Sequence, residues 1–203
     1  MGLISDGTTV FDAGAMASGF GGSMTFIKKL TASSSSTLSF VNGASNVVLD
    51  NTYKEYIFTF KDIHPSASTV GLYFNGSADT GSNYNVTKTT SYFLSRHAED
   101  GTSNELSYKT GLDLAQSTGY QPLSIDQIHD NDSSMCGFLH LFNPSDTTFV
   151  KHFLCRTQQM QVDDSMENYS AGYFNTTSAI DAVQFKYASG NIDAGDICLY
   201  GIS

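Results

Sequence analysis

The chain has 203 residues, of which 40% are hydrophobic and only 15% charged, and its formal net charge at pH 7 is −10. This length fits one large all-β domain that buries a core without disulfides or metal ions. Ten Lys and Arg residues against twenty Asp and Glu residues exclude clustered contacts to phosphate groups, so we expect neither nucleic acid nor an anionic membrane as a partner.

Residues 1–24 are rich in glycine and carry isolated apolar side chains, which predicts an N-terminal arm ahead of a domain spanning 25–203. Two interpretations stay open: the arm folds back on its own domain, or it docks on a partner subunit. The apolar residues available for docking are Leu3, Ile4, Val10, Phe11, Met16 and Phe20. The chain shows no basic segment followed by a continuous apolar run, so we expect neither a secretory leader nor a transmembrane span.

From residue 25 onward, apolar and polar residues alternate with a period of two, which is typical of half-buried strands. The clearest example is the range 53–63, where Tyr56, Phe58 and Phe60 fall on one face. Pro65 is expected to stop this strand, and Asn75-Gly76 is expected to form a turn. Strands are predicted at 26–30, 38–41, 53–63, 70–74, 86–94, 135–142, 149–156, 169–174, 179–187 and 197–202, with a brief one at 106–108. About nine or ten strands without a persuasive helix predict an antiparallel β-sandwich or jelly roll.

The cysteines and histidines do not show metal-binding spacing. Cys136, Cys155 and Cys198 lie far apart, beside or within apolar runs, and are therefore predicted to be buried free thiols. His140 and His152 lie on two strands that are expected to form a hairpin and would then be cross-strand neighbours. Hydrogen-bonded strand histidines are favoured over metal ligands at these positions.

Other signs of chemistry are equally weak. The acidic loop Asp126 to Asp132 offers oxygen ligands for calcium but lacks the glycine and final glutamate of an EF-hand loop, so a solvated loop is favoured. The sequence contains no G-x-S-x-G motif and no Gly-rich segment between a strand and a helix. We therefore expect a protein that is not an enzyme and needs no cofactor or metal. Tyrosine supplies amphipathic contact area, and the candidate contacts to a glycan or receptor are Tyr84, Tyr92, Tyr108 and Tyr120.

Several segments carry a resemblance: Phe26–Ser33, Tyr53–Phe58, Ser82–Val86, Leu141–Ser145, and patches between Gly172 and Ile202. They are similar to a group of small β-structured virion proteins of tailed bacteriophages, particularly phages of aquatic bacteria, and together they cover most of residues 25–203 in patches. The resemblance implies a virion surface protein, commonly a homotrimer, that assembles in the cytoplasm of the host bacterium. It transfers no catalytic residue, and the Gly-rich start matches no attachment module of the group.

Three roles follow from these observations. In the first, the sandwich is a short fibre or appendage whose arm anchors it to capsid or tail proteins. In the second, the protein is a capsid decoration (cement) protein that clamps shell subunits, since a fibre is usually longer than 203 residues. The third, from another class, is a carbohydrate-binding module for a host surface glycan, although the chain has no Trp, the preferred sugar-stacking residue.

Overall fold

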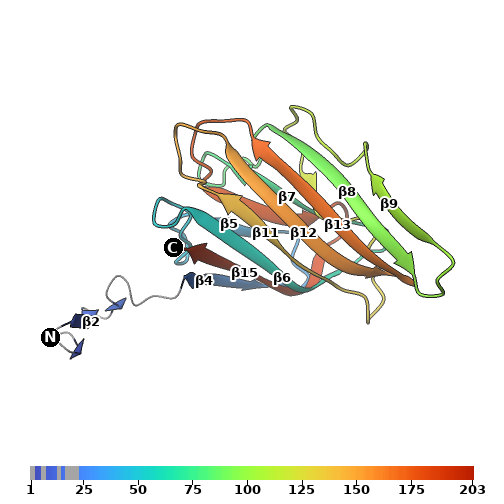
Figure 1. The fold of residues 1–203 in the computed structure, drawn as a ribbon, viewed down its shortest axis with the longest axis horizontal. Coiled ribbons are helices and arrows are strands. Elements are labelled where there is room, and N and C mark those ends of the chain that lie inside the picture. The colour runs from blue at the N-terminus through green and yellow to red at the C-terminus, as the bar shows by residue number, and fades with distance from the viewer. Residues whose placement is uncertain (1–2, 6–7, 13–14, 17–22) are drawn as a thin grey trace.

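The computed structural model describes residues 3–5, 8–12, 15–16 and 23–203, with side chains from residue 23 onward. The described residues form strands and loops without a helix. Two antiparallel sheets pack face to face (Figure 1), which confirms the predicted β-sandwich.

The large sheet has eight strands, and each of them is antiparallel to its neighbours. From edge to edge these are β4 (Met24–Thr31), β15 (Ile192–Ile202), β6 (Glu55–Pro65), β11 (Met135–Phe142), β12 (Lys151–Gln161), β13 (Asp164–Phe174), β8 (Lys88–Ala98) and β9 (Asn104–Tyr108). Burial alternates along most of these strands, most regularly along β12, because successive side chains of a strand point to opposite faces. One face of the large sheet therefore lines the core, and the other faces outward.

The small sheet covers the inner face of the large one. Its order is β10 (Gln121–Pro122), β7 (Leu72–Ser77), β14 (Ala182–Tyr187) and β5 (Leu38–Val41). A third sheet lies within the predicted arm and consists of β1 (Leu3–Ser5), β2 (Thr8–Asp12) and β3 (Ala15–Met16). In Figure 1, β1–β3 lie beyond the start of β4, apart from both sheets of the sandwich.

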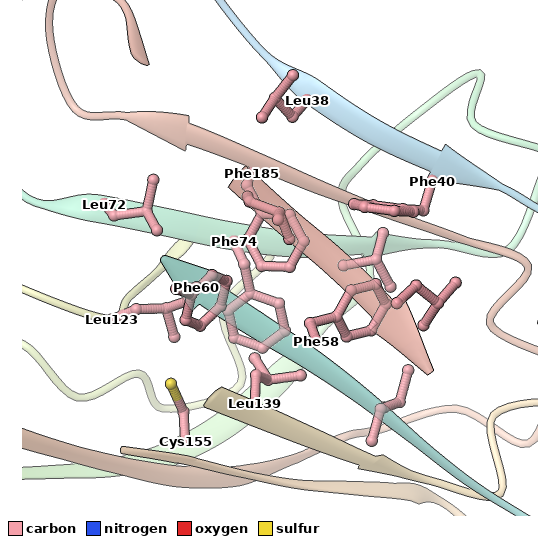
Figure 2. Packing of buried hydrophobic residues seen from close by; sticks show 14 of the residues in the cluster. Leu38, Phe40, Phe58, Phe60, Leu72, Phe74, Leu123, Leu139, Cys155 and Phe185 are labelled. Carbon is pink, nitrogen blue, oxygen red and sulfur yellow. The ribbon is translucent and has the colours of Figure 1, made fainter. Parts of the chain in front are cut away.

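Aromatic rings gather at the centre of the space between the two sheets, with leucine and other aliphatic side chains around them (Figure 2). Phe185 of β14 is fully buried at the centre, with its ring centroid 5.4 Å from those of Phe58 and Phe60. The ring centroids of Phe40 and Phe74 each lie 6.3 Å from that of Phe185. Most of these rings meet edge to face, an arrangement that adds attraction beyond the burial of apolar area.

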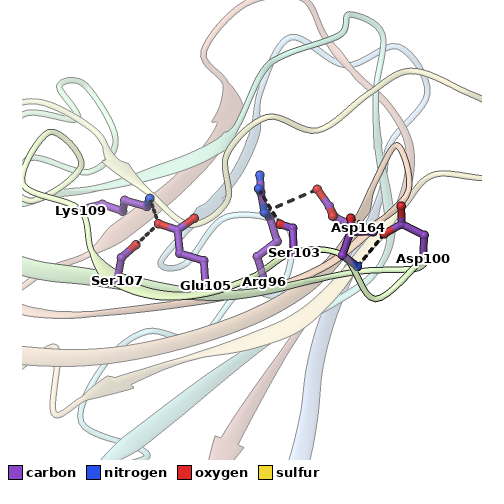
Figure 3. Close-up of polar contacts among 8 residues, drawn as sticks. Arg96, Asp100, Ser103, Glu105, Ser107, Lys109 and Asp164 are labelled. Atoms are coloured by element: carbon purple, nitrogen blue, oxygen red, sulfur yellow. Dashed lines mark hydrogen bonds and ion pairs between the residues drawn. The ribbon is translucent and has the colours of Figure 1, made fainter.

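Toward β8 and β9 the apolar core ends in a small second cluster, and polar contacts follow beyond it. Tyr92 and Leu94 form a second, smaller cluster with Met166. Beyond it, Lys109 and Ser107 bond the Glu105 carboxylate, each at 2.5 Å, and Arg96 lies 3.6 Å from Asp164 (Figure 3). These contacts give the charged groups partners at the edge of the sheet, where the aromatic core no longer covers them.

The structure corrects one predicted turn. Asn75-Gly76 lies inside β7, opposite Gln184 and Val183 of β14. A Cβ at Gly76 would lie 2.9 Å from the Phe174 ring, so glycine permits a close approach in the core here instead of a turn. The Asn75 side-chain amide donates to the carbonyls of Tyr84 and Thr118, at 2.7 and 3.0 Å. These long-range contacts outweigh the local preference of an Asn-Gly pair for a turn.

Other strands differ in their ends. Strand β6 continues to Pro65, two residues past the predicted end at 63, whereas β5 and β11 have the predicted bounds. Strands β12 and β13 extend farther toward their shared turn, and β15 begins at Ile192 instead of 197. The two-residue β10 was not predicted, because so short a strand carries no periodicity.

Two buried lysines sit in one row on the inner face of the large sheet. Phe174 of β13 pairs with Lys151 on one side and with Lys88 on the other. Lys88 is fully buried, and its Nζ donates to the carbonyl of Gly119 at 2.6 Å. Burial lowers the pKa of its ammonium group from 10.5 to about 7. Lys151 donates to the carbonyls of Phe149 and Thr176, and burial lowers its pKa as well, partly offset by Asp146.

We expect the free energy of unfolding to rise between pH 7 and about pH 9. In this window Lys88 carries its proton in the unfolded chain but not in the folded protein. A lower pH therefore favours the unfolded state, and the free energy of unfolding increases as the pH rises. Below pH 7 both states are protonated and this contribution is constant. Above about pH 9 the rise ends, because burial raises the pKa of the Cys155 thiol and the thiol ionises first in the unfolded chain. Above about pH 10 the trend reverses, because burial also raises the pKa of Tyr56 to about 12 and the unfolded tyrosine ionises first.

Urea denaturation of wild type and Lys88→Met across this pH range measures the effect. The stability of Lys88→Met relative to wild type is expected to fall steadily as the pH rises. Lys151→Met serves as the comparison and is expected to change the pH dependence less, since Asp146 supports the charged form of Lys151. Parallel curves for wild type and Lys88→Met would contradict the assignment.

Candidate interaction surface

The face of the large sheet that points away from the small sheet, here called the outer face, is crossed by two rows of directly paired residues. The first row runs from β4 to β8 through Phe26, Tyr200, Ile57, His140, Leu154, Ala171 and Ser91. The second runs from β4 to β9 through Lys29, Cys198, Thr59, Phe138, Arg156, Tyr169, Phe93 and Tyr108. Apolar and aromatic side chains predominate in both rows.

Many of these side chains are exposed. The exposed fraction is 57% for Phe26 and 52% for Leu154 and Tyr108, and Phe93 and Phe138 are exposed as well. Soluble monomers rarely present a continuous apolar patch larger than a few hundred Å², and larger patches mark contact sites. The outer face is therefore the strongest candidate for a functional surface in the described part of the chain.

Stacking and ion pairs hold the middle of the outer face in one arrangement. The rings of Phe93 and Tyr169 stack with centroids 4.6 Å apart and an interplanar angle of 6°. The Arg156 guanidinium lies over the Tyr169 ring at 5.3 Å and also bonds Glu167. The Tyr169 hydroxyl donates to the other oxygen of Glu167 at 2.6 Å. These mutual contacts leave the polar groups of this region already satisfied.

Two adjoining hollows lie on the outer face where strands β12, β13 and β8 run side by side. One has a volume of about 280 Å³ and is bordered by Phe93, Phe138 and Tyr169. The other measures about 400 Å³ and is bordered by His152 and Tyr173. Ser91, Leu154 and Ala171 line both hollows. The hollows exist because Ala171 and Ser91 are small while the rows on either side carry rings.

The charges of the outer face occur in opposite pairs. Lys29 lies 3.2 Å from Asp196, and Lys61 lies 3.7 Å from Asp62. Nδ1 of His140 lies 2.5 Å from Oε1 of Glu55. The two lysine pairs and the Arg156–Glu167 pair cancel, which leaves the outer face close to neutral, although the whole chain carries −10.

Signals for the outer face exist in the sequence but were not used to predict it. In 135–142 and 149–156, apolar residues occupy both faces of the strand, as in Phe138-Leu139 and Phe153-Leu154. Such runs are typical of strands covered on both sides. The strands themselves were predicted, whereas the joining of their outward residues into rows depends on strand order.

The structure separates the four tyrosines proposed as glycan or receptor contacts. Tyr92 is fully buried, because its position in β8 points inward and Asn168 accepts its hydroxyl at 2.7 Å, so it is not a surface contact. Tyr108 lies on the outer face. Tyr120 donates to Gln184 of the small sheet at 2.5 Å, and Tyr84 is half-buried in the loop after β7. No single site gathers them among residues 23–203.

The residues proposed for docking lie in the arm. Leu3 and Ile4 belong to β1, Val10 and Phe11 to β2, and Met16 to β3. The backbone of Phe11 pairs with Leu3 and with Met16. Phe20 lies outside the described residues. Docking by these residues stays a prediction.

The predicted hairpin of β11 and β12 is confirmed, but its register differs from the expectation for the histidines. His140 pairs with Leu154, which places His152 two residues farther along the same face. Of the three cysteines, only Cys155 is buried, and burial raises the pKa of its thiol. Cys136 is exposed and Cys198 partly exposed, because both occupy outward positions of their strands.

The acidic loop Asp126 to Asp132 accepts a hydrogen bond from within the fold. The Asp130 carbonyl lies 3.1 Å from Nε2 of His64. Within the ranges that the structure describes, no three His, Cys, Asp or Glu side chains converge on a point that suits a metal ion. The same ranges contain no helix that is long and apolar enough to cross a membrane.

Comparisons of the chain with protein-family models, with curated proteins and with solved structures find no match.

Proposed function

We propose that the protein is a non-enzymatic structural component of the surface of a tailed-phage virion, a short fibre or appendage protein anchored by its N-terminal arm. The observation that carries the proposal is the outer face, on which apolar side chains from all eight strands of the large sheet are aligned and those of β4, β8, β9, β11 and β12 are exposed. A protein that leaves such a face open is suited to assembly with other subunits.

The rest of the molecule supports the same role. The excess of acidic residues lies mainly away from the outer face and keeps a dense, repeated surface soluble. The arm carries its own short sheet, apart from the sandwich, and can engage another protein without disturbing the core (Figure 1). The proposed assembly is a homotrimer that docks on capsid or tail proteins, in line with the sequence resemblance.

A capsid decoration protein is the second candidate function. Strands β1 and β3 are the edges of the arm sheet, and the free edge of a short sheet is a place where a strand of a shell protein can add by backbone pairing. This geometry favours a clamp between shell subunits.

Gold-labelled antibodies against residues 24–203, applied to virions produced from the genome that encodes the chain, test the proposal by electron microscopy. We expect labels at the tail or at head fibres. Labels spread over the shell would establish the decoration role instead. Virions without label would overturn both roles, and a glycan array would then test the carbohydrate-binding alternative.

The role of the arm is tested with a truncated chain that starts at Thr25. This chain is expected to fold, because the described core and both sheets of the sandwich lie almost entirely within 25–203. It is expected to be missing from virions when it replaces the full-length chain. Incorporation of the truncated chain at the normal level would contradict anchoring by the arm.

A further inference from the structure

We infer that the outer face is the surface through which copies of this chain bind one another. The inference rests on the proposed assembly role and names the partner of that surface. Area, charge and shape each point to a second copy.

The area of the outer face suits a stable interface. The seven strands from β4 to β8 each have at least eight residues. At a spacing of about 4.8 Å they give the face a width of about 29 Å, and eight residues extend about 26 Å. The product, about 750 Å², is comparable to the roughly 800 Å² that each partner contributes to a standard interface.

The charge pattern favours an identical partner over a strongly charged one. Two copies that each carry −10 repel one another over most of their surface. The outer face is the exception, because Lys29, Lys61 and Arg156 are each paired with a carboxylate on the same face. A nucleic acid or a basic protein would find no excess charge there to bind.

The shape of the outer face also fits a copy of itself. Leu154 and Phe138 project beside the hollow above Ala171 and Ser91. In an interface between identical subunits, the projecting side chains of one copy can enter the hollows of the next. A glycan would instead need free hydrogen-bonding groups, whereas Arg156, Glu167 and Tyr169 already bond one another or stack.

The test is the mass of the full-length protein in solution, measured by sedimentation for wild type and for Leu154→Asp. Wild type is expected to sediment as an oligomer. Leu154→Asp is expected to raise the dissociation constant by at least about tenfold, because assembly would bury an unpaired carboxylate. Ala171→Trp fills the hollow without adding charge and is expected to weaken association as well.

Val162→Asp is the matched control. Val162 is 53% exposed against 52% for Leu154, but it lies in the turn between β12 and β13, off the outer face. It receives the same charge and is expected to keep the mass of wild type. Thermal melts under conditions where each protein is monomeric are expected to show that all three variants keep the fold.

A trimeric wild type that Leu154→Asp dissociates supports the inference together with the proposed homotrimer. A dimeric wild type that Leu154→Asp dissociates supports the inference and overturns the trimer. Monomeric wild type at 100 µM, or an oligomer unaffected by Leu154→Asp and Ala171→Trp, overturns the inference. The virion labelling tests the proposed role and sedimentation tests the interface, so either proposal can be overturned without the other.

Discussion

Replacing Phe185 with alanine is expected to lower the free energy of unfolding by about 3–5 kcal/mol, the range for a large ring removed from a packed core. Phe185 is fully buried, and its ring meets those of Phe58 and Phe60 at 5.4 Å. These neighbours belong to β6 in the opposite sheet, so the cavity would open between the two layers. The rings on either side are themselves packed and cannot collapse fully into the space.

Urea denaturation of the Phe185→Ala variant measures this loss. Phe149→Ala is the control, because Phe149 is 70% exposed in the loop before β12 and its removal leaves no cavity. The control is expected to change stability by less than about 0.5 kcal/mol. Equal stability losses in the two variants would contradict the described centre of the core.

Replacing Gly195 with alanine is expected to lower the free energy of unfolding by about 2–4 kcal/mol, through backbone strain combined with a steric clash. Gly195 has φ +109° and lies where the register of β15 against β6 shifts. A Cβ there would run into the carbonyl oxygen of Asp62 and lie 2.7 Å from Cα of Ile63. On the other side of β15, the Gly195 carbonyl accepts the amide of Ala32 at 2.8 Å, so the backbone has little freedom to move away.

Gly101→Ala separates strain from clash. Gly101 has φ +72° in the turn between β8 and β9, and its Cβ would meet no atom within 4 Å. Only the cost of the left-handed backbone remains there, about 1–2 kcal/mol. Urea denaturation of both variants under the same conditions makes the comparison. If both variants lost the same free energy of unfolding, the result would show that β6 shifts to make room for the added methyl group at Gly195.

The candidate surface was predictable only in part. The strands that carry it were predicted, and Tyr108 was predicted as a contact residue because tyrosine supplies amphipathic contact area. Phe138, Leu154 and Tyr169 were not named, since each looks like an ordinary strand residue in its own segment. They become a surface because β11, β12, β13 and β8 lie side by side, which no local pattern reveals. The same reasoning explains Tyr92, whose inward direction follows from its pairing partners and from the buried amide of Asn168.

Local alternation of apolar and polar residues was enough to predict the all-β class, most of the strands and the inward residues of β6, because a period of two is a local property of the chain. It could not predict the strand order, the place of Asn75-Gly76 inside a strand or the bulge at Gly195, which depend on contacts between distant segments. The tertiary structure also joined residues as distant in sequence as Phe26 and Tyr200 into one row. Contacts of this kind depend on which strands become neighbours. The packing of the whole core around rings such as Phe185 determines those neighbours.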